Sequence, residues 1–359
     1  MLYTSRVAQL QTTLTQLGYQ AFLVEDQVNL YYLTGLDLSA GRLLVTQKEA
    51  FLFVDGRYLE RCQTLSPFPV IRTEPNSDTF KDWLHHHPLI SRIAFSQGTT
   101  SFKQYRELAK IDQNFSRKIE WIPLDSPVEQ LRITKDPEEL EALQTAADLG
   151  SRGFDFLCEL LKPGISEVEA ATELEIFWKR QGAEPGFKPI IAFGANSSMP
   201  HYRPGHTKLK SRDSVLIDIG VVLDHYYSDM TRMAYLGTPL PKMAEIHAIV
   251  QEAQQAAIAL CVPGTTTGQL DDAARSMIRK AGYGDQFLHG LGHGVGLEIH
   301  EAPFLRNRDI VLQPGMVITI EPGIYLPGIG GVRIEDTLLV SKAGPAKSLT
   351  KRPVEPFIK

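Results

Sequence analysis

The sequence feature that most constrains the fold is a repeated helix-start signal. Pro163-Gly164-Ile165-Ser166 recurs one hundred positions later as Pro263-Gly264-Thr265-Thr266. In each copy, a Ser or Thr is followed three positions later by Glu169 or Gln269, which is the pattern of a capping box at a helix N-terminus. Pro-Gly before a helix is common by chance, so the prediction of a duplication depends on the residues downstream of each copy.

Acidic residues repeat downstream in the same order. Asp218-Ile219-Gly220 is mirrored by Glu321-Pro322-Gly323, and Asp229-Met230-Thr231 is mirrored by Glu335-Asp336-Thr337. Each half is therefore expected to contain helices followed by a pair of strands that carries two carboxylates. A joint alignment of caps and acidic residues is much rarer by chance than one match, so we predict an internal duplication.

The first acidic pair lies in two strand-like segments. Residues 214–222 and 225–236 are rich in apolar and β-branched side chains and are separated by the short break Leu223-Asp224, which predicts a hairpin. With the turn centred on this break, Asp218 faces Asp229 with about 5 Å between the Cβ atoms. Two carboxylates that face each other in a sheet destabilise it unless a positive charge lies between them.

The second acidic pair has the same arrangement. Glu321 and Glu335 are centred on position 328, inside the glycine-rich turn 327–331. Four carboxylates in apolar strands would carry about four negative charges into a low dielectric, which is too costly without counter-charges. Two divalent cations would balance them, and carboxylates suit manganese, with cobalt, zinc or iron as alternatives.

Histidines near the acidic segments strengthen the prediction of a metal site. Residues 288–301 contain His289, His293 and His300 and are too rich in glycine to form a helix. Three histidines this close together favour metal ligation and proton transfer, whereas a single one is more often a core residue. By contrast, His85-His86-His87 has no acidic partners in its segment and is expected on a solvated surface.

Composition and charge exclude several classes of protein. The 359 residues have a formal net charge of −5 and no basic block, which argues against a nucleic-acid binder. We find neither a secretory signal nor an apolar run of the roughly 18 residues that a membrane helix needs. The three cysteines lack paired spacing, which argues against a disulfide framework and a thiolate zinc site. We therefore expect a cytoplasmic protein that binds neither membranes nor nucleic acid.

Two domains are expected in an α+β chain. Residues 1–125 mix helical spacing with short apolar strands and predict a small α/β domain, and residues 126–359 form the duplicated domain. The proline-containing stretch 121–137 is interpreted as a linker. It ends in a capping box that starts at Asp136, and the helix after this cap is expected to run to about Leu161.

These residues, in this order, resemble the pita-bread metallopeptidase family of aminopeptidase P, prolidase and methionine aminopeptidase. The resemblance implies a creatinase-like domain in residues 1–125 and a pita-bread catalytic domain with a pseudo-twofold repeat in residues 126–359. Residues 29–35, 55–58 and 199–202 are similar to the proline-specific branch. The motifs that carry the resemblance are Asp218-Ile219-Gly220, Asp229-Met230-Thr231-Arg232, residues 289–301, Glu321-Pro322-Gly323-Ile324-Tyr325 and Gly331-Val332-Arg333-Ile334-Glu335-Asp336.

Residue by residue, the resemblance implies a two-metal peptidase site. The positions that match the family's metal ligands are Asp218, Asp229, His293, Glu321 and Glu335. His201 and His300 would hydrogen-bond the substrate and stabilise the oxyanion, and Glu321 would also transfer a proton. The metals would supply water of lowered pKa as the nucleophile. The positions that match the substrate pocket or the support of the ligands are Tyr202, His289, Tyr325 and Arg333.

The resemblance also implies cleavage of the bond before proline, a tertiary amide whose geometry the ring restricts. The first expectation is an aminopeptidase P that releases the N-terminal residue of Xaa-Pro peptides, and the alternative is an Xaa-Pro dipeptidase (prolidase). The two activities differ in what closes the far end of the substrate cleft. Sequence motifs give little information about this closure. A metal-free creatinase and a non-catalytic peptide-binding module are more remote alternatives, against which the complete ligand set argues.

A homodimer is implied as well, with the first domain near the cleft of a neighbouring subunit. The segment Tyr32–Ala40 carries Asp37 directly after the turn at Thr34-Gly35. We expect Asp37 to reach the substrate and to influence which peptide lengths fit, since an acidic group attracts an ammonium and repels a carboxylate. The alternative is that Asp37 lies on a surface loop and contacts no substrate.

Overall fold

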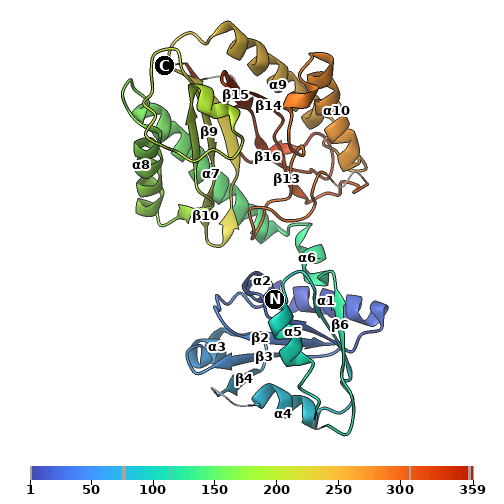
Figure 1. The fold of residues 1–359 in the computed structure, drawn as a ribbon. Helices are drawn as coiled ribbons and strands as arrows, with labels where there is room; N and C mark the ends of the chain where they lie inside the picture. The colour runs from blue at the N-terminus through green and yellow to red at the C-terminus, as the bar shows by residue number, and fades with distance from the viewer. Residues whose placement is uncertain (1, 75–77, 114, 307–308, 355–356, 359) are drawn as a thin grey trace. The chain divides into compact units, whose positions relative to one another are not determined.

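The computed structural model describes residues 2–74, 78–113, 115–306, 309–354 and 357–358. Its contacts separate two compact units, Met1–Arg132 and Ile133–Lys359, each visible as a distinct body in Figure 1. The boundary lies one short helix after the expected position 125. Helix α6 (Pro127–Arg132) packs against α1 (Leu2–Leu17), so it belongs to the N-terminal unit.

The N-terminal unit is built on one sheet. Its strands are β1 (Ala21–Val24), β2 (Arg42–Thr46), β3 (Ala50–Asp55), β4 (Val70–Thr73), β5 (Arg92–Ser96) and β6 (Glu120–Leu124). The strand order is β4-β3-β2-β1-β5-β6, with β1, β2 and β3 antiparallel and the outer strands parallel to their neighbours. The other helices are α2 (Gln27–Thr34), α3 (Leu59–Leu65), α4 (Thr79–His86) and α5 (Phe102–Leu108).

The predicted α/β character of this unit is confirmed by the covering of its sheet. Successive side chains of a strand point to opposite faces. Leu23 of β1 packs with Phe80 of α4 and Leu108 of α5 in one apolar cluster. Phe22 and Val24 point to the other face and are buried there as well. Both faces of the sheet are therefore covered, as α/β packing requires.

The stretch 121–137, interpreted as a linker, contains the boundary between the two units, but a strand and a helix occupy most of it. Strand β6 occupies its start and helix α6 its middle. Pro123 lies in an edge strand, which is where sheets accommodate proline. Pro127 is the first residue of α6, where its missing N–H removes no intrahelical bond. The prolines thus mark a sheet edge and a helix start.

The C-terminal unit contains the duplicated elements. Its helices are α7 (Pro137–Leu160), α8 (Glu167–Arg180), α9 (Pro241–Ala259) and α10 (Thr267–Lys280), with the 3-10 turns η1 (Gly194–Ser198) and η2 (Gly284–Gln286). Its strands are β7 (Glu184–Pro185), β8 (Ile190–Phe193), β9 (Ser214–Ile219), β10 (Val221–Leu223), β11 (Tyr226–Tyr227), β12 (Met230–Tyr235), β13 (Val317–Ile320), β14 (Gly323–Leu326), β15 (Gly330–Arg333), β16 (Asp336–Leu339), β17 (Lys347–Ser348) and β18 (Phe357–Ile358). Across the described residues of both units, no helix has the length and apolar character needed to cross a membrane.

Contacts at equivalent positions confirm the duplication. Ser166 and Thr266 each complete a capping box at the start of α8 and α10. Leu209 and Leu312 each donate a backbone hydrogen bond of 2.8 Å to the residue just before these caps. The capping box predicted at Asp136 is also present, and it starts α7. Each half therefore has the same contact between a helix start and the segment that leads into β9 or β13.

The first acidic hairpin forms with a register two residues away from the predicted one. Asp218 lies opposite Thr231 rather than Asp229, because the turn consists of Asp224 and His225. Both turn residues have positive φ, 48° and 72°, and such a two-residue turn matches the twist of antiparallel strands. The predicted direct pairing is wrong. A shift of two residues preserves the face on which a side chain lies, so both aspartates still point to the same side.

The second acidic hairpin has the predicted register. β13 pairs with β16 and β14 pairs with β15, and both ladders are centred on position 328. Glu321 and Glu335 occupy opposing positions in the break between these ladders. Their backbone N–H groups donate elsewhere, to Leu291 O at 2.9 Å and to Thr231 O at 3.1 Å. Both carboxylates thus lie where the ladder opens and where a segment from another part of the unit inserts.

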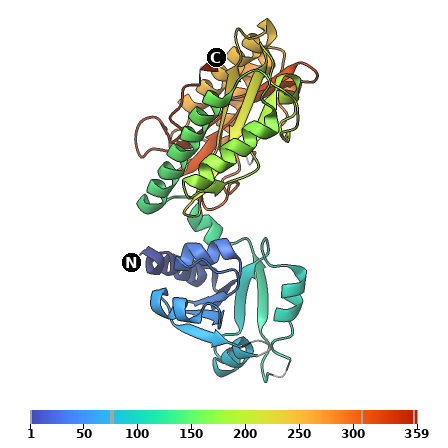
Figure 2. The same cartoon turned by 90° about the vertical axis from the view of Figure 1, so that its left-hand side faces the viewer.

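Two pairs of helices enclose these strands. Figures 1 and 2 show α7 and α8 on one side of the strands of the C-terminal unit and α9 and α10 on the other. Ile217 and Ile219 of β9 pack in one apolar cluster with α7 and α8, and Ile318 and Ile320 of β13 pack with α9 and α10. Asp218, between the two isoleucines of β9, therefore points away from the helices and toward the second half.

The matched caps give a test of the duplicated fold. Ser166→Ala and Thr266→Ala should each lower the free energy of unfolding by about 1 kcal/mol, because each removes the side-chain acceptor of a helix N-terminal N–H. Urea denaturation followed by circular dichroism measures this loss. Ser166→Thr keeps a hydroxyl at the cap and serves as the control. An equal loss in Ser166→Thr and Ser166→Ala would show that the cap hydroxyl is not responsible.

Candidate active site

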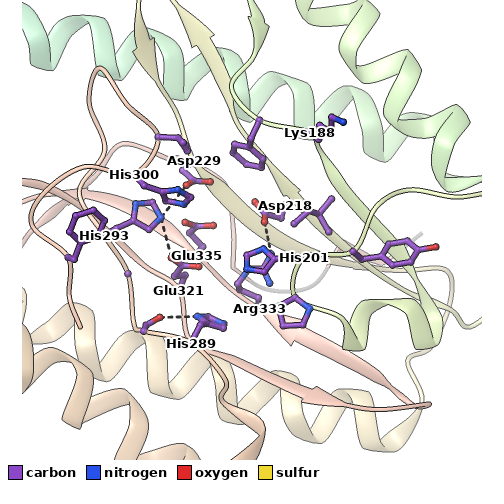
Figure 3. Close-up of a pocket in the computed structure, with 18 of the residues that line it drawn as sticks. Lys188, His201, Asp218, Asp229, His289, His293, His300, Glu321, Arg333 and Glu335 are labelled. Atoms are coloured by element: carbon purple, nitrogen blue, oxygen red, sulfur yellow. Dashed lines mark hydrogen bonds and ion pairs between the residues drawn. The ribbon is translucent and has the colours of Figure 1, made fainter. Parts of the chain in front are cut away.

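The acidic and histidine residues singled out from the sequence meet in one cavity of the C-terminal unit. The cavity has a volume of about 480 Å³. Figure 3 shows the carboxylates of Asp229, Glu321 and Glu335 grouped with His293 and His300, while Asp218 lies beside Arg333 and His201. The sequence-predicted residues that line it are His201, Tyr202, Asp218, Asp229, His289, His293, His300, Glu321, Arg333 and Glu335.

Three of these residues form a compact group that can hold a metal ion. One ligand atom each from Asp229, His293 and Glu335 lies within 4.8 Å of the others. Nε2 of His293 is 3.6 Å from Asp229 Oδ2 and 3.4 Å from Glu321 Oε1. Carboxylate oxygens and an imidazole nitrogen at this spacing are a donor set that suits borderline divalent metals.

Glycines bring the histidine segment against the strand that carries Glu321. The N–H of Thr319 donates to His293 O at 2.7 Å, and the N–H of His293 donates to Thr319 Oγ1 at 3.0 Å. A Cβ on Gly292 would lie 2.0 Å from Thr319 O, and a Cβ on Gly294 would lie 2.4 Å from Ala302 O. Only glycine permits this approach, which explains the glycine-rich composition of residues 288–301.

Burial and like charges raise the pKa of the carboxyl groups. Desolvation, followed by repulsion from neighbouring carboxylates, holds the pKa of Asp229 and Glu335 well above its usual range. Burial raises the pKa of Glu321 to about 8. Burial has the opposite effect on the imidazole of His293, whose pKa falls to about 4, because it disfavours the charged form. The metal-free site therefore favours protonated carboxyls and a neutral histidine.

The donors of this site fit a metal. Oε2 of Glu335 accepts from Thr231 Oγ1 at 2.7 Å, whereas its Oε1 is buried and has no hydrogen-bond partner among the described residues. A buried carboxylate oxygen without a donor is costly. His293 is neutral and so able to offer Nε2 as a ligand. A divalent cation would supply both the partner for this oxygen and positive charge beyond that of Arg333, which pairs with Asp218.

A chain of contacts connects Asp218 to His289. Arg333 Nη2 pairs with Asp218 Oδ2 at 2.5 Å, and Arg333 Nη1 donates to the hydroxyl of Tyr325 at 2.7 Å. The same hydroxyl is 2.8 Å from His289 Nε2. Tyr325 is only 2% exposed and lies behind the lining residues. The arrangement favours the supporting role for Tyr325 over direct contact with a substrate.

His201 and His300 lie at the more exposed part of the cavity. The ring of His300 contacts that of His293 edge to face, with 4.3 Å between centroids. Tyr202 lines the cavity, and its hydroxyl donates to the buried Glu167 at 2.7 Å. Tyr202 thus anchors the segment that presents His201. The substrate contacts expected for these residues stay predictions.

Asp37 belongs to the N-terminal unit and is exposed between the buried Leu36 and Leu38. The described residues that line the cavity lie at positions 187–335, within the C-terminal unit. The expected contact of Asp37 with a neighbouring subunit's substrate stays a prediction.

The sequence did not predict several residues of the site. Thr231 holds Glu335, and the correct hairpin register would have placed it opposite Asp218. Phe187 and Phe304 form apolar parts of the lining, and Arg306 adds a cation. None of these three belongs to a local pattern, because they enter the cavity from separate loops.

Comparison with known proteins covers both units. Residues 141–342 match the sequence model described as "Metallopeptidase family M24", and residues 6–134 match that of the "Creatinase/Prolidase N-terminal domain". Among curated proteins, an Xaa-Pro dipeptidase from Pyrococcus furiosus is 39% identical over 334 residues. This alignment covers 91% of this chain and 92% of the relative.

Solved structures give the same likeness in three dimensions. The Xaa-Pro dipeptidase from Bacillus anthracis matches with a TM-score of 0.93 at 34% identity, over 99% of this chain and 100% of that chain. The X-Pro aminopeptidase from Thermotoga maritima matches with a TM-score of 0.88 at 31% identity, over 96% of this chain and 99% of that chain.

The raised carboxyl pKa values predict how stability depends on pH in the metal-free protein. Between the ordinary pKa of Glu321, 4.5, and its value of about 8 in the folded chain, the folded state binds a proton that the unfolded state does not. Stability should therefore fall as pH rises toward 8. His289 and His293, whose pKa values are about 4, act in the opposite direction only below pH 6.5.

Urea denaturation in a chelating buffer between pH 6.5 and 9 measures this dependence. Metal binding displaces the protons, so the stabilisation by added Mn²⁺ should grow over the same range. A metal-free stability that stays constant or rises with pH would contradict the assignment of buried, mutually repelling carboxylates.

Proposed function

The chain belongs to metallopeptidase family M24, and from this premise we propose that it hydrolyses Xaa-Pro dipeptides with two divalent metal ions. The observation that carries the proposal is the convergence of four carboxylates and His293 in one cavity. The family implies a dinuclear metal centre, and the names of the relatives favour a dipeptidase. This changes the order expected from the sequence, in which aminopeptidase P came first and prolidase was the alternative.

The proposed metal ligands are Asp218, Asp229, His293, Glu321 and Glu335. Oxygen-rich donors with one imidazole favour manganese, with cobalt, zinc or iron as alternatives. When bound, two such ions supply a water of lowered pKa and polarise the carbonyl of the scissile bond. Asp229 and Glu335 would hold metal together with His293, since a ligand atom of each lies within 4.8 Å of the others.

The protein's own groups then handle protons and charge. Glu321, which accepts from Thr319 Oγ1 at 3.3 Å, is proposed to take a proton from the attacking water and return it to the proline nitrogen. His201 and His300 line the cavity and can donate N–H groups to the carbonyl oxygen as its negative charge develops. Arg333 holds Asp218 in place.

The cavity walls support selection of a short proline peptide. Phe187 and Phe304 offer apolar surface that suits the pyrrolidine ring. Lys188, Arg203 and Arg306 add positive charge. In a dipeptide the carboxylate follows the proline directly, so a cation in the cavity wall complements it, whereas a longer peptide continues as a neutral amide. Charge complementarity of this kind supports the dipeptidase over the aminopeptidase.

Aminopeptidase P activity is the second candidate, because the likeness to the Thermotoga maritima X-Pro aminopeptidase extends over 96% of this chain. The homodimer and the contact of Asp37 with a neighbouring subunit's substrate also belong to the proposal. Asp37 is exposed, as such a contact requires.

Three substrates that differ after the proline test the proposal. With Mn²⁺, the protein should hydrolyse an Xaa-Pro dipeptide about tenfold more efficiently than Xaa-Pro-amide or an Xaa-Pro-Xaa tripeptide, the usual effect of one charge-assisted hydrogen bond. Xaa-Ala is the control for proline selectivity. Steady-state kcat/KM for each substrate is the measurement.

Arg306→Gln should raise KM for the dipeptide and leave the tripeptide nearly unchanged, because only the dipeptide presents a carboxylate beside the proline. A preference for the tripeptide would establish the aminopeptidase instead. No hydrolysis of any Xaa-Pro substrate by the metal-loaded protein would overturn both candidates.

A further inference from the structure

A buried ion pair holds the end of the histidine segment. Lys135 Nζ lies 2.7 Å from Glu301 Oε1, and their side chains are 1% and 7% exposed. Glu301 directly follows His300, which lines the cavity. Lys135 is not among the residues that line the cavity, so its side chain reaches the site indirectly, through Glu301.

Glu301 closes the segment that begins at Gly294. The N–H groups of these two residues each donate to the other's carbonyl oxygen at 3.0 Å. The second carboxylate oxygen of Glu301 accepts from the N–H of Glu298 at 3.3 Å. A Cβ on Gly296 would lie 2.3 Å from Glu301 Oε1, so the carboxylate packs against the backbone within this loop. The loop between His293 and His300 therefore folds around the Glu301 side chain.

Lys135 is itself fixed to the segment that leads into β13. Its N–H donates to Gly315 O at 2.9 Å, and Thr134 bridges to Met316 just before β13 begins. β13 is also the strand against which His293 lies, through Thr319. The segment with Lys135 and the loop with His293 are thus both held at β13, and the ion pair links the two.

We propose that Lys135 is a positioning residue, whose ion pair with Glu301 fixes the imidazole of His300 over the metal-binding carboxylates. The inference rests on the proposed function, because it assigns the pair a role in peptide hydrolysis. Replacing a buried ion pair by apolar residues of similar size is often neutral for stability, so stability of the fold alone does not explain why an ion pair lies here. An ion pair restrains the geometry of the side chains that form it, whereas the backbone of a glycine-rich loop is otherwise free to adopt many conformations.

A double variant separates positioning from folding. Each single substitution would leave a buried charge without its partner and could unfold the protein. Lys135→Met combined with Glu301→Gln removes both charges together and keeps an amide oxygen that can accept from the N–H of Glu298. This double variant should fold, bind two Mn²⁺ per chain and keep KM within about twofold. Its kcat should fall about 10- to 100-fold, as a displacement near 1 Å of a catalytic group does.

A core variant provides the matched control. Leu174 of α8 is fully buried among residues that pack on the outer face of β9, away from the cavity. Leu174→Ala should lower the melting temperature at least as much as the double variant while leaving kcat unchanged. A double variant with the kcat of the wild type would overturn the proposal, and loss of bound Mn²⁺ would show that the pair holds the metal centre rather than His300.

A spectroscopic measurement keeps this result independent of the substrate. The imidazole signals of His300 in ¹³C-labelled protein, identified by their absence from His300→Ala, should shift and broaden in the double variant and stay unchanged in Leu174→Ala. An unchanged His300 signal overturns the positioning role. If the wild-type protein hydrolyses no Xaa-Pro substrate but the signal shifts, the proposed function fails while the positioning of His300 stands.

Discussion

Repulsion among four carboxylates in one cavity is the constraint on which the rest of the C-terminal unit depends. Asp229 and Glu335 are 5% and 2% exposed, and burial together with like charge holds both pKa values above the usual range. A fold that concentrates acids in this way is stable near neutral pH only if protons or cations neutralise them. The buried oxygen of Glu335, which has no partner among the described residues, indicates that cations fill this role.

The duplicated architecture explains how the acids come together. Each half contributes one hairpin with two carboxylates, and its helices cover the outer face of that hairpin. The inner faces then meet across the pseudo-twofold relation. The halves differ where chemistry requires it, because the second half alone inserts the glycine-rich segment with His293 and His300. In the first half, the buried Glu167 holds the segment with His201 through the hydroxyl of Tyr202.

Much of the duplicated fold was predictable from the sequence because it depends on interactions between residues that are close along the chain. Caps at Ser166 and Thr266 depend on residues within one turn, so the repeat and the helix starts were predictable. The hairpin register around Asp218 was not, because the turn at Asp224 depends on a positive φ that its flanking sequence did not indicate. Since the error was two residues, the face of each aspartate was still correct.

Contacts that join distant loops could not be predicted. The apolar lining by Phe187 and Phe304, and the ion pair of Lys135 with Glu301, arise only when separate segments pack together. The prolines in 121–137 marked the region of the boundary between the units but did not reveal its strand and helix. Proline occurs at sheet edges and helix starts as readily as in linkers, and only the neighbouring strand or helix decides between them.

The central claim is that the buried carboxylates form one two-metal centre. Isothermal titration of the metal-free protein with Mn²⁺, with elemental analysis of the product, measures it most directly. The account predicts two ions per chain in the wild type and in His201→Ala, and loss of metal together with activity in Glu335→Gln, whose side chain cannot supply the same charge. Two ions retained by Glu335→Gln, or none bound by the wild type, would contradict it.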